Sequence, residues 1–457
     1  MDKNFVSIIL AAGMGTRMKS EMPKVLHKVC GKALCEYPIE VSEKAGAEEV
    51  VVVVGHKAEM VKEYLGDRVK YALQQQQLGT GHAVMQALDF LKGKRGYVII
   101  LGGDTPLITE ETVKRAIAEH ESLKNSATVI TAQLPDPYGY GRIIRNADGG
   151  VVKIVEQKDA NKEEAKVKEV NSGMYVFNID SLIGALSLIT NNNAQGEYYL
   201  TDTLEILIKK GERVGAYVLE NPYEMSGVND RVQLAQVNKM LQARIVEGHM
   251  RSGVTIYNPE TIYIESDVVI GRDTVIFPNV TITQKSKIGK NVVIGMNSQI
   301  VNSTIEDGVE INCSVITDSH VCKDAKIGPF AYLRPNSKIG DHVKIGDFVE
   351  IKNSTLGEGT KVAHLTYIGD AKVGKNVNFG CGTVTVNYDG KKKYVTEIGD
   401  NAFIGCNTNL VSPVTVKKNA YIAAGSTITD EVPENALAIA RSRQVNKLSW
   451  KDKRDNK

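Results

Sequence analysis

The chain has 457 residues, more than one hydrophobic core normally organises, so we expect two or three domains. Hydrophobic residues make up 42% and charged residues 24%, which excludes disordered, collagen-like and membrane-embedded proteins. The formal net charge of +2 indicates no general affinity for nucleic acid or for anionic lipid.

The first apolar stretch, residues 5–12, is too short to span a bilayer and ends in a glycine-rich loop instead of a cleavage site. We therefore expect a cytoplasmic protein. The six cysteines form no CxxC pair and lie mostly in strand-like runs, which favours free thiols over disulfides or a zinc site. A reducing compartment fits this cysteine pattern.

Residues 1–229 alternate short β-rich runs with helical stretches, and the runs are 6–10, 50–54, 98–101 and 128–132. This alternation predicts an α/β domain with a Rossmann-like, mostly parallel sheet that is covered by helices on both faces. Ligands of such sheets bind at the carboxyl ends of the strands. We therefore expect the first functional site in the loops that follow these runs.

A glycine-rich loop follows the first predicted strand, and it consists of Leu10, Ala11, Ala12, Gly13, Met14, Gly15, Thr16 and Arg17. Small side chains let backbone N–H groups approach phosphate oxygens closely, and a helix that begins after the loop would add its positive end. Arg17 and the nearby Lys24 are suited to neutralising a triphosphate. The segment therefore indicates a nucleotide-binding site.

The pattern changes at residues 230–250, where apolar residues recur at helical spacing after Asp230, a candidate N-cap. The apolar positions are Leu234, Val237, Leu241 and Ile245. We expect a linker helix here, followed by a second domain at 251–457.

From about residue 255 onward, aliphatic residues recur every six positions and are often followed by glycine. Neither an α-helix nor a simple strand has this period. It is typical of a parallel β-helix of hexapeptide repeats, in which one aliphatic residue per repeat points into the core. The recurring residues are Ile264, Ile270, Ile276, Ile282, Ile288, Ile294 and Ile300, and further runs cover 327–351 and 398–428.

The period slips by one residue at Leu356 and at Val373, and the segment 380–397 departs from it most. This segment contains three consecutive lysines, and we expect it to form a loop outside the solenoid. It is either a solvated insertion or a binding loop, because insertions in solenoids often carry binding chemistry.

The loop after the first strand, together with Pro23 and Lys24, resembles the sugar-phosphate nucleotidyltransferases. The repeats narrow this resemblance to the family of bifunctional N-acetylglucosamine-1-phosphate uridylyltransferases and glucosamine-1-phosphate acetyltransferases, and it covers nearly the whole chain. It implies that the C-terminal domain acetylates glucosamine 1-phosphate with acetyl-CoA. It also implies that the N-terminal domain then couples the product to UTP with Mg²⁺ and releases pyrophosphate.

The same resemblance implies a left-handed β-helix and a homotrimer in which the loop of one subunit completes a neighbour's site. It implies small-molecule substrates, with neither nucleic acid nor membrane as a partner. For UTP it assigns the glycine-loop residues, Arg17 and Lys24, and also Gln74, Gly79 and Thr80, where an amide and main-chain groups suit a base edge. The plainer interpretation of the last three is a polar turn that enters a helix, and spacing alone does not separate UTP from dTTP.

Two further sets of N-terminal residues follow from the resemblance. Asp104 directly follows the third predicted strand, and with Asn229 it matches the family's magnesium ligands. Two protein oxygens suffice, because Mg²⁺ takes its other ligands from phosphates and water. The sugar phosphate is assigned to Gly141, Glu156, Asn171 and Asn229.

In the β-helices that the chain resembles, three hexapeptides form one coil, so residues 18 apart stack on one face. Arg334 and Lys352 are related in this way, and their backbones should lie about 4.8 Å apart. Two stacked cations without an acidic neighbour in register repel each other, so we expect them to bind the phosphate of the sugar. The alternative is two solvated surface cations.

His364 matches the family's general base, which takes a proton from the glucosamine amine as the amine attacks the thioester. Without the resemblance, a lone histidine is more often structural. Tyr367 and Asn378 are assigned to the sugar phosphate, and the loop residues Asn387 and Tyr388 to the sugar phosphate or acetyl-CoA. Acetyl-CoA is further assigned to Lys393, Cys406, Ala424 and Arg441. The family usually has serine where Cys406 stands, which puts that serine's polar role in doubt here.

The main alternative function is a nucleotidyltransferase whose β-helix is only an oligomerisation or regulatory platform. His364, the stacked Arg334 and Lys352 and the loop at 380–397 favour a second enzyme, because a platform needs none of them. A non-enzymatic nucleotide-binding scaffold would leave the acidic and amide residues beside the glycine loop unexplained.

Overall fold

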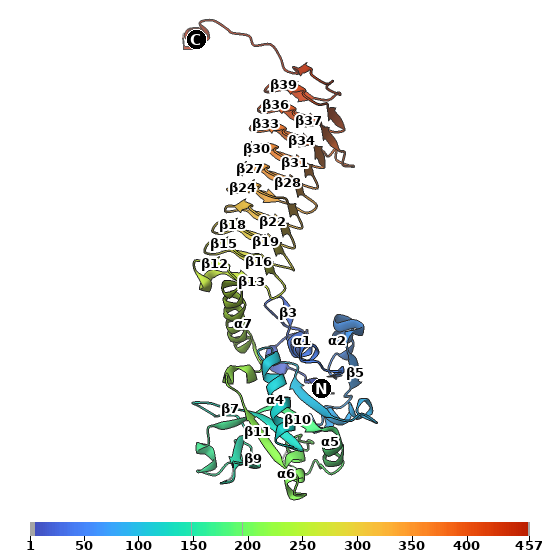
Figure 1. Cartoon of the computed structure of the whole chain (residues 1–457). Coiled ribbons are helices and arrows are strands. Elements are labelled where there is room, and N and C mark those ends of the chain that lie inside the picture. The colour runs from blue at the N-terminus through green and yellow to red at the C-terminus, as the bar shows by residue number, and fades with distance from the viewer. Residues whose placement is uncertain (1–4, 148, 194, 456–457) are drawn as a thin grey trace. The chain divides into compact units, whose positions relative to one another are not determined.

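The computed structural model describes residues 5–147, 149–193 and 195–455. The chain divides into two compact units, with the boundary between Leu241 and Gln242 in helix α7 (Arg231–Arg251). The first unit is an α/β domain and the second is a parallel β-helix, as the sequence predicts. Figure 1 shows the first unit in blue to green and the second in yellow to red.

The first unit is built on a nine-stranded sheet in which seven strands follow the order β11-β7-β10-β6-β1-β4-β5. One side of the sheet is parallel and consists of β6 (Tyr97–Gly102), β1 (Phe5–Ala11), β4 (Glu49–Val54) and β5 (Lys70–Leu73). The strands predicted at 6–10, 50–54, 98–101 and 128–132 are all confirmed.

Antiparallel strands complete this sheet. β10 (Glu169–Asn178) runs antiparallel between β6 and β7 (Ala127–Gln133), and β11 (Val214–Val218) runs parallel to β7. β8 (Arg142–Arg145) pairs antiparallel with both β10 and β9 (Val151–Val155). This group of strands carries the predicted sugar-phosphate residues.

Helices cover both faces of the sheet, as predicted. One core contains side chains of α1 (Glu36–Ala45), α2 (Ala58–Leu65) and α4 (Glu110–Ser122). The other contains side chains of α3 (Thr80–Met85), α5 (Ile179–Leu186) and α6 (Asp202–Lys209). Successive residues of β4 alternate between the two cores, which is why the strand reads as an unbroken run of valines.

The helix expected directly after the glycine-rich loop was a wrong prediction. A three-residue turn, η1 (Thr16–Met18), follows the loop, and then come η2 (Lys24–Leu26) and the hairpin β2 (Lys28–Val29) and β3 (Lys32–Ala33). Lys19 has a left-handed backbone with φ 48°, and Pro23 lacks an N–H and disfavours helical geometry at the residue before it. A continuous helix therefore cannot form until α1.

The expected cap of the linker helix is confirmed. The Gln233 N–H donates to Asp230 Oδ1 at 2.8 Å, and the Gln233 side-chain oxygen accepts from the Asn229 N–H at 2.8 Å. The start of α7 therefore holds the backbone of Asn229 in place. No helix in the described part of the chain is long and apolar enough to cross a membrane.

The second unit winds through three parallel sheets of eleven, ten and nine strands, from β12 (Thr255–Ile256) to β41 (Leu437–Ala438). The strands are two to four residues long, and each coil adds one strand to each sheet, as the ladder of arrows in Figure 1 shows. In most strands an aliphatic residue points inward, and these residues form a single buried core.

The β-helix contains more irregularities than the sequence predicts. The slips at Leu356 and Val373 are confirmed, but five-residue steps also lead to Ile305, Ile316 and Val321. Each of these steps turns on a residue with a left-handed backbone at φ 43–44°, namely Asn302, Cys313 and Asp318. Three slips so close together shift the phase of the period, which hid this part of the solenoid.

The loop predicted at 380–397 is also shorter than expected. β34 (Val384–Val386) lies inside it and pairs with β31 (Tyr367–Gly369) and β37 (Asn409–Val411). Thr385 is 1% exposed and stands where other strands have an aliphatic residue, so the period seemed to end there. The segment outside the strands is 387–395, where the Tyr394 N–H donates to the Asn387 carbonyl at 2.9 Å.

Candidate functional site

The glycine-rich loop lies at the carboxyl end of β1, between the ends of β4 and β6. The Gly103 N–H donates to the Leu10 carbonyl at 2.9 Å, and the His56 N–H donates to the Ala12 carbonyl at 3.3 Å. A Cβ at Gly55 would lie 2.8 Å from the Ala12 oxygen, so Gly55 permits this close approach. The loop is therefore anchored by its neighbours while Gly13 and Arg17 stay exposed.

Gly15 has φ +62°, and a Cβ there would lie 2.6 Å from the Lys24 Cβ. Because Gly15 has no side chain, Lys24 can pack directly against the loop. The Lys24 Nζ donates to Asp104 Oδ2 at 2.5 Å and to Asn229 Oδ1 at 3.3 Å. Because β6 positions Asp104 and α7 positions Asn229, residues far apart in the sequence converge on one ammonium group.

Gln74 follows β5 and is buried. Its Nε2 lies 3.1 Å from both the Gly79 oxygen and His82 Nδ1. The Thr80 hydroxyl accepts from the Leu200 N–H at 3.2 Å. The three residues predicted at the base therefore lie together, with some of their polar groups already used to hold the turn. Their role toward uracil stays a prediction.

The predicted sugar-phosphate residues lie together where β8, β9 and β10 meet. The Asn171 N–H donates to the Gly141 carbonyl at 2.9 Å. A Cβ at Gly141 would lie 3.3 Å from Glu156 Oε1, so this glycine leaves room for the carboxylate. The Asn171 side chain is held by the Tyr175 hydroxyl at 2.9 Å and by the Gly173 N–H. Partial burial, and then the charge of Asp159, raise the pKa of Glu156.

In the β-helix, Arg334 and Lys352 stack on adjacent coils, because β25 (Tyr332–Leu333) pairs in register with β28 (Glu350–Lys352). The expectation that no acidic residue accompanies them is wrong. Arg334 Nη1 donates to Glu350 Oε1 at 2.6 Å. Glu350 lies two residues before Lys352 and therefore faces the same side of its strand.

Lys352 has a second cation beside it. The adjacent Lys393 ammonium, then burial and the charge of Arg334, lower the pKa of Lys352, while Asp370 opposes the shift. Lys393 comes from the segment 387–395, so this segment brings its charge back to the coil that carries Lys352. Three cations against two carboxylates, those of Glu350 and Asp370, leave one excess positive charge that suits an anion.

Asp370 anchors that segment. It is buried, and its carboxylate accepts from the side-chain amides of Asn353 and Asn387. The Asn387 amide also lies 3.5 Å from the Tyr367 hydroxyl. Asn387 and Tyr367 are thus brought together as predicted, but Asp370 was not anticipated.

His364 ends β30 (Lys361–His364), and its Nδ1 lies 2.7 Å from Asp347 Oδ1 of β27 (Lys344–Asp347). The His364 side chain is largely exposed, and that of Asp347 is partly exposed. This hydrogen bond lowers the pKa of the Asp347 carboxyl, so the carboxylate stays ionised. A carboxylate on Nδ1 favours the tautomer that leaves Nε2 free to accept a proton.

The positions predicted for acetyl-CoA continue from His364 along the eleven-stranded sheet. His364 stands two residues past the inward-facing Val362, and in the next three coils the same position is held by Cys381, Cys406 and Ala424. The Arg441 side chain packs over Gly425, beside the last of them, with its Cδ 3.8 Å from a Cβ placed there. These residues therefore form one column along successive coils.

Two predicted residues do not join the others within this chain. Asn378 begins β33 (Asn378–Phe379) in the eleven-stranded sheet, whereas Arg334, Lys352 and Tyr367 belong to the ten-stranded sheet. The Tyr388 hydroxyl donates to the Gly390 carbonyl in its own turn at 2.7 Å and is exposed.

Comparisons with known proteins match both units. A sequence profile described as nucleotidyl transferase matches residues 6–223, and one described as bacterial transferase hexapeptide, with six repeats, matches 318–353 and 396–430. A bifunctional protein GlmU of Acetivibrio thermocellus is 59% identical over 97% of this chain and 96% of its own length. Those of Caldanaerobacter subterraneus subsp. tengcongensis and Clostridioides difficile are 58% and 54% identical, over 100% and 99% of this chain and 99% of each relative.

The chain belongs to the bifunctional GlmU family. It is an enzyme with a nucleotidyltransferase domain and a hexapeptide domain of the acyltransferase type. Membership of the GlmU family supports two activities over a nucleotidyltransferase that carries the β-helix only as a platform.

Sequence reasoning missed His82, Asp347, Glu350 and Asp370 at these sites in the GlmU fold. His82 lies two residues after Thr80, and its contact with Gln74 depends on the tight turn between them. Asp347 is 17 residues from His364, because the slip at Leu356 shortens the coil. Counting 17 residues instead of 18 across that slip would have identified it.

Proposed function

We propose that the C-terminal unit transfers the acetyl group of acetyl-CoA to the amine of glucosamine 1-phosphate. The N-terminal unit then couples N-acetylglucosamine 1-phosphate to UTP and gives UDP-N-acetylglucosamine and pyrophosphate. The observation that carries the bifunctional proposal is the His364 and Asp347 pair, at 2.7 Å, at the head of the column that leads to Arg441. A platform for oligomerisation needs no such pair.

In the acetyl transfer, Asp347 accepts a hydrogen bond from His364 Nδ1, and Nε2 takes a proton from the attacking amine. The amine nitrogen bonds to the thioester carbonyl carbon, the carbon–sulfur bond breaks, and the proton passes to the leaving thiolate. Arg334, Lys352 and Lys393 hold the sugar phosphate. Cys406 and Ala424, small residues along the same column, give the coenzyme room, and Arg441 meets its phosphates.

In the uridylyl transfer, a phosphate oxygen of the sugar 1-phosphate attacks the α-phosphorus of UTP, and pyrophosphate leaves. No protein nucleophile is needed, because the loop amides, Arg17 and Lys24 neutralise charge and hold the reactants in line. Gln74, Gly79 and Thr80 contact the uracil. Gly141, Glu156 and Asn171 contact the N-acetylated sugar.

The residues at Asp104 and Asn229 suit Mg²⁺. Their oxygens already share one cation, since both accept from the Lys24 ammonium at 2.5 and 3.3 Å. A carboxylate and an amide oxygen are ligands that Mg²⁺ prefers. Asp104 and Asn229 would hold the ion, which when bound neutralises charge on the substrate phosphates.

A homotrimer and a cytoplasmic location are part of the same proposal. Asn378 lies on a different sheet from Arg334, Lys352 and Tyr367, which fits an acetyl-transfer site that is completed by a neighbouring subunit. None of the six cysteines, all of which lie in the described part of the chain, forms a disulfide, which fits a reducing compartment.

A two-stage assay on the purified protein tests the proposed function. Glucosamine 1-phosphate and acetyl-CoA are supplied with Mg²⁺, free thiol is followed, and UTP is then added while pyrophosphate is followed. We expect thiol in the first stage and pyrophosphate in the second. If thiol never forms but N-acetylglucosamine 1-phosphate and UTP still give pyrophosphate, the β-helix is a platform and the acetyl-transfer proposal is wrong.

A further inference from the structure

The nine-stranded sheet of the β-helix has an unusual position directly after its inward-facing aliphatic residue. Glycine follows in six of the nine strands, between β14 (Val269–Ile270) and β35 (Thr396–Ile398), at 271, 289, 340, 357, 374 and 399. Lys417 follows the last strand, β38 (Val414–Val416). The other two exceptions are adjacent: Glu306 follows β20 (Thr304–Ile305), and Cys322 follows β23 (His320–Val321).

Close packing between coils explains the glycines. A Cβ at Gly289 would lie 2.5 Å from Asp307 Oδ1, and one at Gly340 would lie 2.8 Å from the Leu356 oxygen. Side chains at this position are therefore generally excluded. Two successive exceptions that place a carboxylate and a thiol one above the other call for an explanation beyond packing.

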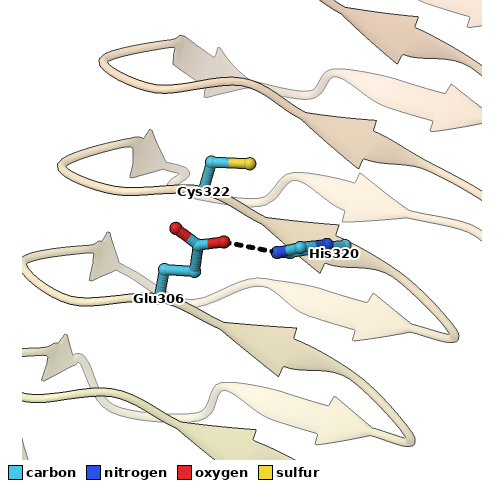
Figure 2. A group of neighbouring side chains, drawn as sticks. All are labelled: Glu306, His320 and Cys322. Carbon is cyan, nitrogen blue, oxygen red and sulfur yellow. Dashed lines mark hydrogen bonds and ion pairs between the residues drawn. The ribbon is translucent and has the colours of Figure 1, made fainter.

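A histidine joins these two residues on the outer surface. Ile305 and Val321 pair in register and point inward, so their neighbours in sequence, Glu306, His320 and Cys322, point outward. His320 Nε2 lies 2.7 Å from Glu306 Oε1. Figure 2 shows the Glu306 carboxylate directed at the His320 ring; His320 and Cys322 lie on one coil, and Glu306 lies on the coil below.

One ligand atom from each of the three side chains lies within 4.8 Å of the other two, and all three residues are partly exposed. In a tetrahedral zinc site, bond lengths of 2.0–2.3 Å put ligand atoms roughly 3.3–3.8 Å apart. Side-chain rotation alone can close a difference of about 1 Å. The partial exposure leaves a path by which a metal can enter.

We propose that Glu306, His320 and Cys322 bind Zn²⁺ and link two successive coils of the β-helix. A thiolate with an imidazole favours zinc over magnesium or calcium, which prefer oxygen ligands. The three residues supply three of four tetrahedral positions, and water takes the fourth. On binding, Cys322 releases its proton, and the hydrogen bond between Glu306 and His320 gives way to two metal bonds.

Burial, and then the charges of Glu306 and Asp341, raise the pKa of the Cys322 thiol, so a metal that binds here has to displace the thiol proton. A divalent cation at this place reverses that preference, because it stabilises the thiolate and the carboxylate together. The site lies on the nine-stranded sheet, apart from the sheets that carry His364 and Arg334, so zinc here acts on the stability of the coils.

Cobalt titration of the full-length protein tests the site, because thiolate-bound Co²⁺ has a near-ultraviolet charge-transfer band. Excess Mg²⁺ is present throughout to occupy the proposed N-terminal metal site. We expect a band that saturates at one Co²⁺ per chain and is displaced by Zn²⁺. The variants Cys322→Ser, His320→Gln and Glu306→Gln remove one ligand each. We expect the first to lose the band and the other two to weaken binding.

Matched controls come from the same β-helix. Cys313→Ser removes a partly exposed thiol outside the cluster, and His342→Gln removes an exposed histidine that also pairs with a carboxylate, at 3.9 Å. Both should keep the band, and Zn²⁺ should raise the thermal midpoint of the wild type but not that of Cys322→Ser. Absence of the band in folded wild type, or a band that survives Cys322→Ser, would overturn the proposal.

Discussion

Strand pairing sets the position of His364, and the Asp347 carboxylate sets the orientation of its ring. The register between β27 and β30 brings its ring against Asp347, and the hydrogen bond at 2.7 Å selects which ring nitrogen is left free. Asp347 touches no substrate in the proposed mechanism, so it is a positioning residue for the base. The two residues should therefore differ in how strongly substitution affects the rate.

Replacement of His364 by Ala should lower kcat for acetyl transfer by about 10²–10⁴-fold, the usual contribution of a general base. Asp347→Asn should lower kcat less and leave KM for acetyl-CoA unchanged, because it disturbs the orientation of the base and not the coenzyme contacts. Steady-state thiol release measures both effects. Equal losses in the two variants, or a rise in KM alone, would contradict the positioning role.

At this scale, residue types were easier to predict than their partners. The resemblance located His364 and the stacked cations, but the ion pair of Arg334 with Glu350 was missed because only residues 18 apart were compared. Lys24 and Asn229 meet at Asp104 although 205 positions separate them in the sequence. Spacing along the sequence does not give the distance between such side chains in the fold. Such pairs emerge only once strand register and the helix start are known.

Strand β27 illustrates how tightly the coils pack. A Cβ at Gly346 would lie only 1.9 Å from the Ala363 oxygen of the neighbouring β30. Gly346→Ala should therefore destabilise the β-helix by at least about 1–3 kcal/mol. It should also slow acetyl transfer, because it would separate Asp347 from His364. Urea unfolding and thiol release measure the two effects.

Helix α7 offers the matched substitution with the opposite sign. Gly248 is exposed in the last turn of the helix, and a Cβ there would meet nothing within 4 Å. Gly248→Ala should stabilise the protein by about 0.5–1 kcal/mol, because alanine favours the helix. Similar effects from the two glycine substitutions would refute the packing argument for β27.

Helix α4 carries a buried histidine that makes stability depend on pH. His120 is fully buried, bonded to Thr128 Oγ1 at 2.8 Å and Asn178 Oδ1 at 3.1 Å, and burial lowers its pKa from 6.5 despite the Asn178 bond. The unfolded chain takes up a proton as the pH falls below 6.5, while the folded chain does so only at lower pH. The free energy of unfolding should therefore decrease as the pH is lowered from 6.5 to the lower pKa that His120 has in the folded state.

Urea unfolding of the wild type and of His120→Gln, at about pH 7.5 and about pH 5.5, isolates this contribution. The variant should lose less stability on acidification than the wild type. His27 and His249 also have pKa values lowered by burial, so a smaller acid effect should persist in the variant. An identical acid effect in both proteins would show that folding does not lower the pKa of His120.

Helices and strands were predicted correctly where one physical signal dominated the sequence pattern. The valine run of β4 and the six-residue period each predicted the right element, because burial imposes that pattern. The prediction missed β34 because a polar residue, Thr385, occupies a position that is aliphatic in other strands. It also placed a helix after the glycine loop, where Lys19 and Pro23 prevent helical geometry. The antiparallel β8, β9 and β10 are short or irregular, and their pairing was not anticipated.

On the scale of the whole molecule, two compact units each carry their own polar site. The Lys24, Asp104 and Asn229 group lies in the first unit, and the His364 and Asp347 pair lies in the second. No residue in either group belongs to the other unit. The two proposed reactions should therefore be separable by substitution, although the product of one is the substrate of the other.

The measurement that tests this most directly compares Asp104→Ala, His364→Ala and an equal mixture of the two with the wild type. Thiol release and pyrophosphate release are followed together from glucosamine 1-phosphate, acetyl-CoA and UTP. We predict that Asp104→Ala releases thiol without pyrophosphate. His364→Ala should release pyrophosphate only when N-acetylglucosamine 1-phosphate is supplied, and the mixture should restore both products. Loss of both activities in folded Asp104→Ala would contradict independent sites.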